Sequence, residues 1–118
     1  MLLTAKPFWR NSTGVRRTVT GISFVPAAAV TADDTNYATL TVTKRDYNGA
    51  NSATVVAQTT KITGGSGDWT IHVPVSLGTL SITALDDGEE LVVGIAKAGS
   101  GVAIPAGQLV VSFGGALP

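Results

Sequence analysis

The chain has 118 residues, of which 44% are hydrophobic and only 14% are charged, and its eight basic and eight acidic side chains give a net charge of zero. Length and composition indicate a single folded domain with a sizeable core, not a disordered chain. The absence of cysteine excludes disulfide bonds and thiolate metal sites. A net charge of zero also argues against nucleic acid as a partner, because binding to phosphates requires a basic surface.

The sequence shows neither a membrane segment nor an export signal. The longest apolar run, Phe24 to Val30, contains Pro26 and is far shorter than the roughly 20 residues that a membrane helix needs. The first residues, MLLTAKPFWR, lack an apolar stretch long enough for a signal peptide. We therefore expect a protein made in the cytoplasm without export, with no membrane partner.

The first fourteen residues show no apolar alternation, and we expect an extended N-terminal arm (1–14) ahead of a single β-domain (15–118). Pro7 stiffens this segment and keeps the residue before it extended. The pair Phe8-Trp9 follows, and exposed aromatic pairs are seldom left without a contact. The sequence therefore predicts that Phe8 and Trp9 are presented outward and anchor the arm on a partner protein or a neighbouring subunit.

The beginning of the chain is also basic. Its first twenty residues hold four basic side chains and no acid: Lys6, Arg10, Arg16 and Arg17. All eight acidic residues lie from Asp33 onward. We expect the four basic residues to face carboxylates of the partner, and a solvated flexible tail is the alternative.

Alternating apolar and polar residues predict a series of short strands. The candidates are Arg17–Val25, Tyr37–Lys44, Ala53–Ile62, Trp69–Val75, Leu80–Ala84, Leu91–Lys97 and Leu109–Phe113. Clusters of Gly, Asp, Asn and Ser separate them, and Asn48-Gly49 is a strong hairpin signal. Only the alanine-rich Val25–Thr31 leaves room for a turn of helix. The pattern predicts an all-β fold, an antiparallel sandwich or barrel, and we favour a jelly-roll-like β-sandwich.

The stretch TGGSGDWTIH, residues 63–72, contains three glycines and the chain's single histidine, His72. A phosphate-binding loop would lead into a helix and carry a lysine, whereas here Asp68 follows the glycines and a strand is expected next. No nucleophile motif and no second histidine or cysteine accompany His72. The sequence therefore predicts a turn between strands and not a catalytic site.

Two acidic clusters, Asp33-Asp34 and Asp86–Glu90, are candidate calcium ligands. Neither has the spacing of an EF-hand loop, and Asp commonly stabilises turns through its own side chain. We expect solvated turns. The sequence thus predicts no catalytic residue, no metal site and no cofactor, and it favours a protein that is not an enzyme.

A resemblance to a known class of proteins begins at ADDTNYATLTV, residues 32–42, followed by Lys44-Arg45-Asp46 and Asn48-Gly49. This segment resembles small virion proteins of tailed bacteriophages. The matching order continues with Gly67-Asp68-Trp69 and Val73–Leu77, and then with Val92–Lys97, Gly99-Ser100-Gly101 and Ile104-Pro105-Ala106-Gly107. The likeness covers about residues 32–113 and rests on structural motifs.

The resemblance implies a capsid decoration (cement) protein or the base of a head fibre. Such a protein is a β-sandwich, often a homotrimer, that binds the major capsid protein on the outside of the virion and stabilises the shell. The low charge agrees with a surface covered by a partner, and alternation leaves Val92 and Val110 opposite the core faces of their strands. The alternative is a carbohydrate- or receptor-binding module of a phage tail or head fibre. In that module the rings of Trp69, Tyr37 and Tyr47 would stack on sugars, with Asp68 and Asn48 as hydrogen-bonding partners.

Overall fold

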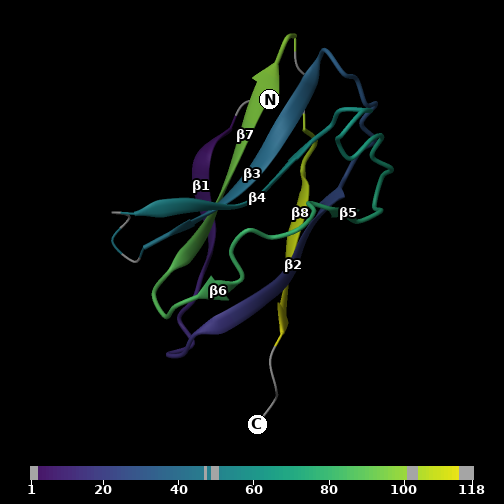
Figure 1. Ribbon diagram of the computed structural model, residues 1–118. Helices are drawn as coiled ribbons and strands as arrows, with labels where there is room; N and C mark the ends of the chain where they lie inside the picture. Colours follow the sequence, from purple (N-terminus) through teal and green to yellow (C-terminus); the bar gives the residue numbers. More distant parts are fainter. Residues whose placement is uncertain (1–2, 47, 49–50, 101–103, 115–118) are drawn as a thin grey trace.

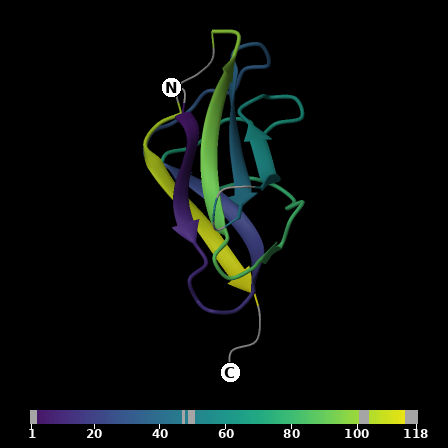
Figure 2. The same cartoon turned by 90° about the vertical axis from the view of Figure 1, so that its left-hand side faces the viewer.

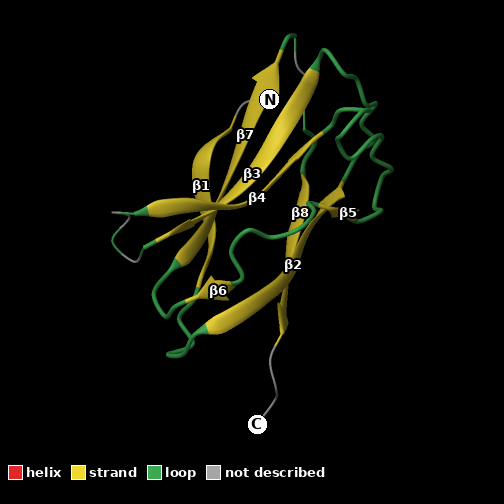
Figure 3. Cartoon of the chain, in the orientation of Figure 1, coloured by secondary structure: helices red, strands yellow, loops and turns green. Residues whose placement is uncertain are grey.

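The computed structural model describes residues 3–46, 48, 51–100 and 104–114, and these form strands, turns and loops without a helix (Figures 1 and 3). The strands are β1 (Leu3–Arg10), β2 (Arg17–Pro26), β3 (Tyr37–Arg45), β4 (Ser52–Thr59), β5 (Val75–Ser76), β6 (Ala84–Leu85), β7 (Glu90–Ala98) and β8 (Gly107–Gly114). The prediction of an all-β fold is confirmed.

The strands form two antiparallel sheets packed face to face, which is a β-sandwich. The first sheet has the order β1-β7-β3-β4. The second is built on β2, which pairs with β8 along one edge and with the short β5 and β6 along the other. In Figure 2 the first sheet lies in front, and β8 and β2 cross behind it. The predicted jelly-roll-like order is not confirmed by this arrangement.

Period-two alternation places the core between the sheets. In β3, Leu40 and Val42 are fully buried, while Thr39, Thr41 and Thr43 are half-buried on the other face. In β2, Val19 and Ile22 are both 1% exposed although they are three residues apart, because a register shift between Val19 and Gly21 restores the alternation. Side chains from both sheets belong to one hydrophobic cluster.

Two of the predicted strands are wrong over most of their length. Within Trp69–Val75, only Val75 belongs to a strand, and within Leu80–Ala84 only Ala84 does. The first segment is interrupted because His72 has a positive φ of 62° and Pro74 has no N–H for a ladder. The turn of helix allowed at Val25–Thr31 is also absent; the chain bends there and bridges Val30 to Trp69.

The expected arm is wrong for Leu3–Arg10. These residues form β1, the edge strand of the first sheet, paired with β7. Two register shifts, one on either side of the Lys6-Pro7 step, break the alternation that would have revealed the strand. Pro7 is tolerated because an edge strand is paired along only one of its sides.

An ion-pair cluster fastens this edge strand to the sheet. Glu90, at the start of β7, is 6% exposed and lies between its two register partners, Arg10 of β1 and Arg45 of β3. Its Oε2 accepts a hydrogen bond from Arg10 Nη2 at 2.9 Å, and its Oε1 accepts one from Arg45 Nε at 2.7 Å. One carboxylate therefore joins three neighbouring strands.

We predict that Glu90→Gln lowers the free energy of unfolding by about 1–2 kcal/mol, because a neutral amide cannot accept charge-assisted bonds from two guanidinium groups. The matched control is Asp86→Asn. Asp86 pairs with Arg16 at 2.6 Å, but both side chains are more than half exposed, so its loss should cost less than about 0.5 kcal/mol. Urea denaturation measures both values, and equal effects would contradict the role given to Glu90.

Candidate functional site: an apolar seam between β1 and β8

The edge strands β1 and β8 meet along one side of the sandwich. The rings of Trp9 and Phe113 lie 4.9 Å apart between centroids and connect them. Phe8 and Leu109 are half-buried and pack against the core from the same two strands. We call these four side chains the seam: Phe8 and Trp9 from β1, and Leu109 and Phe113 from β8.

Two hollows open along the seam. One, of about 430 Å³, is lined by Phe8, Leu109 and Ile104 together with core side chains behind them. The other, of about 250 Å³, is lined by Trp9, Phe113, Thr13 and Arg17. Apolar side chains predominate in the first hollow, which also contains Gln108, whereas the second combines two aromatic rings with Thr13 and Arg17. The core is therefore incompletely covered here, and the seam is suited to contact apolar side chains.

Arg17 supplies the one charge of these linings. Its Nε donates a 3.3 Å hydrogen bond to Thr13 Oγ1, and it makes no ion pair with any described residue. A guanidinium beside two aromatic rings can bind an anion or an aromatic ring, but it cannot serve as a general base. The described residues of the seam therefore present two hollows with a single guanidinium group beside them.

The residues predicted to bind a partner are mostly engaged within the chain. Phe8 and Trp9 are half-buried and pack against the core of their own chain along the seam, and their role as anchors on a partner stays a prediction. Arg10 and Arg16 do face carboxylates, but these belong to Glu90 and Asp86 of the same chain. The side chain of Lys6 lies outside the described residues. The contact between Phe113 and Trp9 was not predicted. Alternation places Phe113 on the inner face of β8, but it cannot show which ring Phe113 contacts.

The glycine-rich stretch is a structural turn, as predicted. Ser66 N–H donates to Thr59 O at 2.9 Å, and Gly67 N–H donates to Lys61 O at 3.0 Å. Trp69 is 2% exposed, and the centroid of its ring lies 5.4 Å from that of Phe24. Its indole N–H donates a 2.7 Å hydrogen bond to Ser66 Oγ. Trp69 is thus a core residue, and the interpretation of this ring as a sugar-stacking platform is wrong.

The other residues of the predicted sugar site do not assemble around it. Asp68 Oδ1 accepts a 2.7 Å bond from Ala32 N–H, which fastens the loop that precedes Trp69. The Tyr37 ring has Lys61 Nζ at 5.2 Å from its centroid. Asn48 is exposed, and Tyr47 lies outside the described residues.

The first acidic cluster forms turns, as expected. Asp33 Oδ1 accepts bonds from Asn36 N–H at 2.6 Å and Thr35 N–H at 2.7 Å, and these lower the pKa of Asp33. The backbone N–H of Thr63, and then its hydroxyl, lower the pKa of Asp34 in the same way.

The second acidic cluster is only partly solvated. Glu89 and Glu90 are buried and pair with basic residues, Glu89 with Lys44 at 3.2 Å, so the expectation of a solvated turn is wrong for them. Among the described residues, no three His, Asp or Glu side chains are grouped to hold a metal ion.

Asn11 carries a glycosylation-like sequence, Asn-Ser-Thr, but its side chain is fully buried. Asn11 Nδ2 donates to Val15 O and Leu85 O, each at 2.9 Å, and its Oδ1 accepts from Thr13. The residue holds the turn before β2 against β6, and no glycan can be attached to it in the folded chain.

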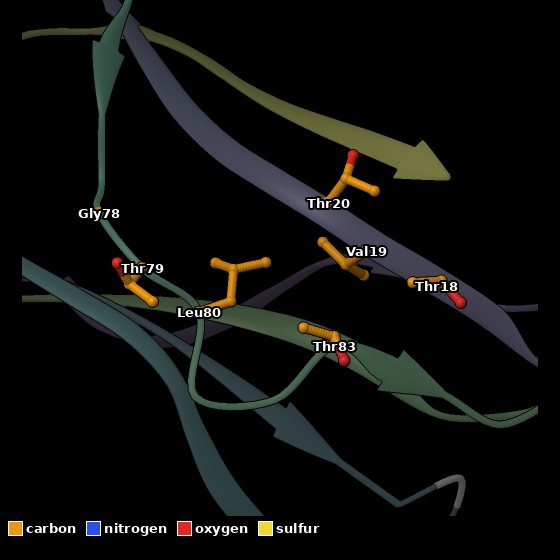
Figure 4. A pocket seen from close by; sticks show the side chains of 7 residues that line it. All are labelled: Thr18, Val19, Thr20, Gly78, Thr79, Leu80 and Thr83. Atoms are coloured by element: carbon orange, nitrogen blue, oxygen red, sulfur yellow. The ribbon is translucent and has the colours of Figure 1, made fainter. Parts of the chain in front are cut away.

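A third hollow, of about 500 Å³, lies between β2 and the segment Gly78–Thr83 (Figure 4). Four threonines line it with Val19 and Leu80: Thr18, Thr20, Thr79 and Thr83. Figure 4 shows Val19 and Leu80 facing one another between β2 and the loop, whereas Thr20 projects from the other side of β2. The hydroxyl groups therefore do not converge on one point.

Comparison with models of protein families, with curated proteins and with solved structures finds no match for this chain. Over the part of the chain that the structure describes, no helix is long and apolar enough to cross a membrane.

We predict that acid destabilises the fold through Asp33 and Asp34. Their lowered pKa means that the folded chain binds fewer protons than the unfolded chain, so the free energy of unfolding falls as the pH drops from about 5 to about 3. The double variant Asp33→Asn/Asp34→Asn should show a smaller pH dependence in urea denaturation. An unchanged slope would contradict the assignment.

Proposed function

We propose that this chain is a non-enzymatic structural protein of a tailed-phage virion, which binds the major capsid protein on the outside of the shell and stabilises it. The sequence resemblance over about residues 32–113 supports this proposal, and a β-sandwich is the fold that it implies. Among the described residues, apolar side chains line the hollows along the seam, and no three His, Asp or Glu side chains are grouped to hold a metal ion.

The observation that carries the proposal is a set of exposed apolar side chains in two anchored loops. Ile62 is 64% exposed, Ile71 47% and Val73 49%. Isolated exposed apolar residues are common, but these three flank Trp69, whose burial holds both loops in place. We call Ile62, Ile71 and Val73 the loop set.

Hydrogen bonds hold these loops in one conformation. His72 N–H donates to Pro26 O at 2.8 Å, and Val73 N–H donates to Thr70 O at 3.1 Å. Thr63, next to Ile62, is bonded to Asp34 through both its N–H and its hydroxyl. An apolar side chain presented by a fixed loop loses less entropy on binding than one on a mobile tail.

In the proposed mechanism, each subunit buries apolar surface against the capsid proteins, and this contact is repeated over the lattice of the shell. Each apolar square ångström removed from water contributes about 25 cal/mol. A subunit that bridges neighbouring capsid proteins opposes their separation, and self-association multiplies the effect. The resemblance implies a homotrimer, and the virion exterior is the corresponding location.

The alternative function, a carbohydrate- or receptor-binding module, has one observation in its favour, the threonine-lined hollow of Figure 4. Its lining has neither an aromatic ring nor a charged side chain, and Trp69 is buried elsewhere. Sugar recognition relies on ring stacking and on convergent polar groups. Decoration of a capsid is therefore the better-supported function.

We predict that Ile71→Ser/Val73→Ser weakens binding to shells of the parent phage's capsid protein by about tenfold or more, because two apolar contacts are lost. The matched control is Val15→Ser, since Val15 is 54% exposed and precedes β2. The start of β2 lies at the opposite end of the sandwich from the connection between β4 and β5, which contains the loop set (Figure 1). Co-sedimentation with the shells measures the affinity. Equal binding of both variants would contradict the loop contact, and failure of the unaltered chain to bind any shell, with selective binding on a glycan array, would establish the alternative.

A further inference from the structure

We propose that the outer edge of β8 is an interface between two copies of this chain, in which β8 pairs antiparallel with β8 of the second copy about a twofold axis at Val110. The second sheet would then continue from one copy into the next. This inference goes beyond capsid binding and does not depend on it, and it gives a twofold pair where the resemblance implies a homotrimer.

The outer edge of β8 pairs with no described strand. Ile22 of β2 lies opposite Val111, and its carbonyl accepts a 3.0 Å bond from Leu77 N–H, on the side away from β8. In an antiparallel ladder the backbone groups of opposed residues point either toward each other or both away. Val111, and Leu109 two residues before it, therefore direct N–H and C=O groups to the open edge.

The edges of the first sheet are protected, whereas β8 is not. On β1, Pro7 and two register shifts prevent a regular ladder with a further strand. On β4, the Val55 carbonyl already accepts a 2.7 Å bond from Ser81 N–H of the adjoining segment. The sequence of β8, GQLVVSFG, has no charge and no proline over eight residues. Such an edge is a template for another strand.

A second β8 is the occupant that fits this edge. With the twofold axis at Val110, Leu109 and Val111 exchange hydrogen bonds with Val111 and Leu109 of the second copy, and Val110 faces Val110. No charged side chain lies on either strand, so no like charges are brought together. Arg17 sits near Phe113, at the far end of β8 from Gly107, and the antiparallel arrangement separates the two guanidinium groups.

The pairing also covers the seam. Leu109 and Val111 face the core side of the second sheet, and the equivalent side chains of the incoming β8 would continue that face beside the edge of β1. The hollow that Phe8 and Leu109 line opens on this side. An incoming strand thus satisfies the backbone of β8 and removes apolar surface from water in one step.

The test introduces a charged side chain in place of Val110, which is 41% exposed and lies on the outer face of β8. Sedimentation velocity at high micromolar concentration should show the unaltered chain as a dimer. Val110→Lys should raise its dissociation constant about tenfold or more, because two ammonium groups would face each other on α-carbons about 4.5 Å apart. Ala57→Lys, which adds the same charge to exposed Ala57 of β4, is the matched control and should remain a dimer.

A rescue experiment tests the register. Val110→Glu alone should also be monomeric, and mixing the Lys and Glu variants should restore a dimer that contains one of each. Hydrogen exchange should show the Leu109 and Val111 amides protected in the dimer and exchanging faster in the Val110→Lys monomer. A monomeric unaltered chain, a trimer, a dimer that persists in Val110→Lys, or a mixture that stays monomeric would each overturn the proposal, whereas co-sedimentation with capsid shells tests capsid binding separately.

Discussion

The loops next to Trp69 depend on the contacts that its indole makes. It lies in the core against Phe24 of the second sheet, and its N–H requires an acceptor because it is buried. Ser66 Oγ supplies this acceptor and in turn donates to Thr59 O, at the end of β4 in the first sheet. A single side chain therefore connects the two sheets through one hydrogen-bonded relay. The loop that holds Ser66 in this position requires glycines. Gly64 and Gly67 have positive φ values of 72° and 74°, and a Cβ on Gly65 would lie 2.6 Å from Lys61 O.

The long strands could be predicted from the sequence, and the irregular ones could not. Burial alternates from Tyr37 to Val42 of β3, and in β8 the half-buried Leu109 and Val111 alternate with exposed neighbours. In β1 the register shifts around Pro7 remove that period, so the strand resembles an arm. The segment from Trp69 to Val73 shows the opposite case, because it alternates perfectly but its apolar residues divide between core and solvent. Periodicity reports which residues share a face only where the backbone stays extended.

The candidate site was predicted only in part, for a related reason. Composition identified Phe8 and Trp9 as residues that require a contact, and the structure supplies one for each within the chain: Trp9 contacts Phe113, and Phe8 packs against the core. Likewise, the basic residues near the start of the chain do face carboxylates, but those of Glu90 and Asp86. A residue's chemistry indicates what kind of partner it needs. Only the fold decides whether that partner lies far along the same chain or on another molecule.

The charged residues of this sandwich are distributed unevenly between its strands. Arg10, Arg45 and Glu90 join β1, β7 and β3, whereas the eight residues of β8 themselves carry no charge that would repel a second strand. Natural edge strands usually carry lysine or proline because an uncharged edge pairs with any extended chain. An edge that lacks these residues is protected from pairing with other chains only when a strand already occupies it. A twofold partner would provide this protection, because each β8 would then have a strand on both sides. A closed pair also displays two copies of the loop set instead of one. Two modest contacts held on one rigid body bind a repeating lattice far more tightly than either does alone, so pairing at β8 and attachment to a shell would reinforce each other without any new contact to the shell.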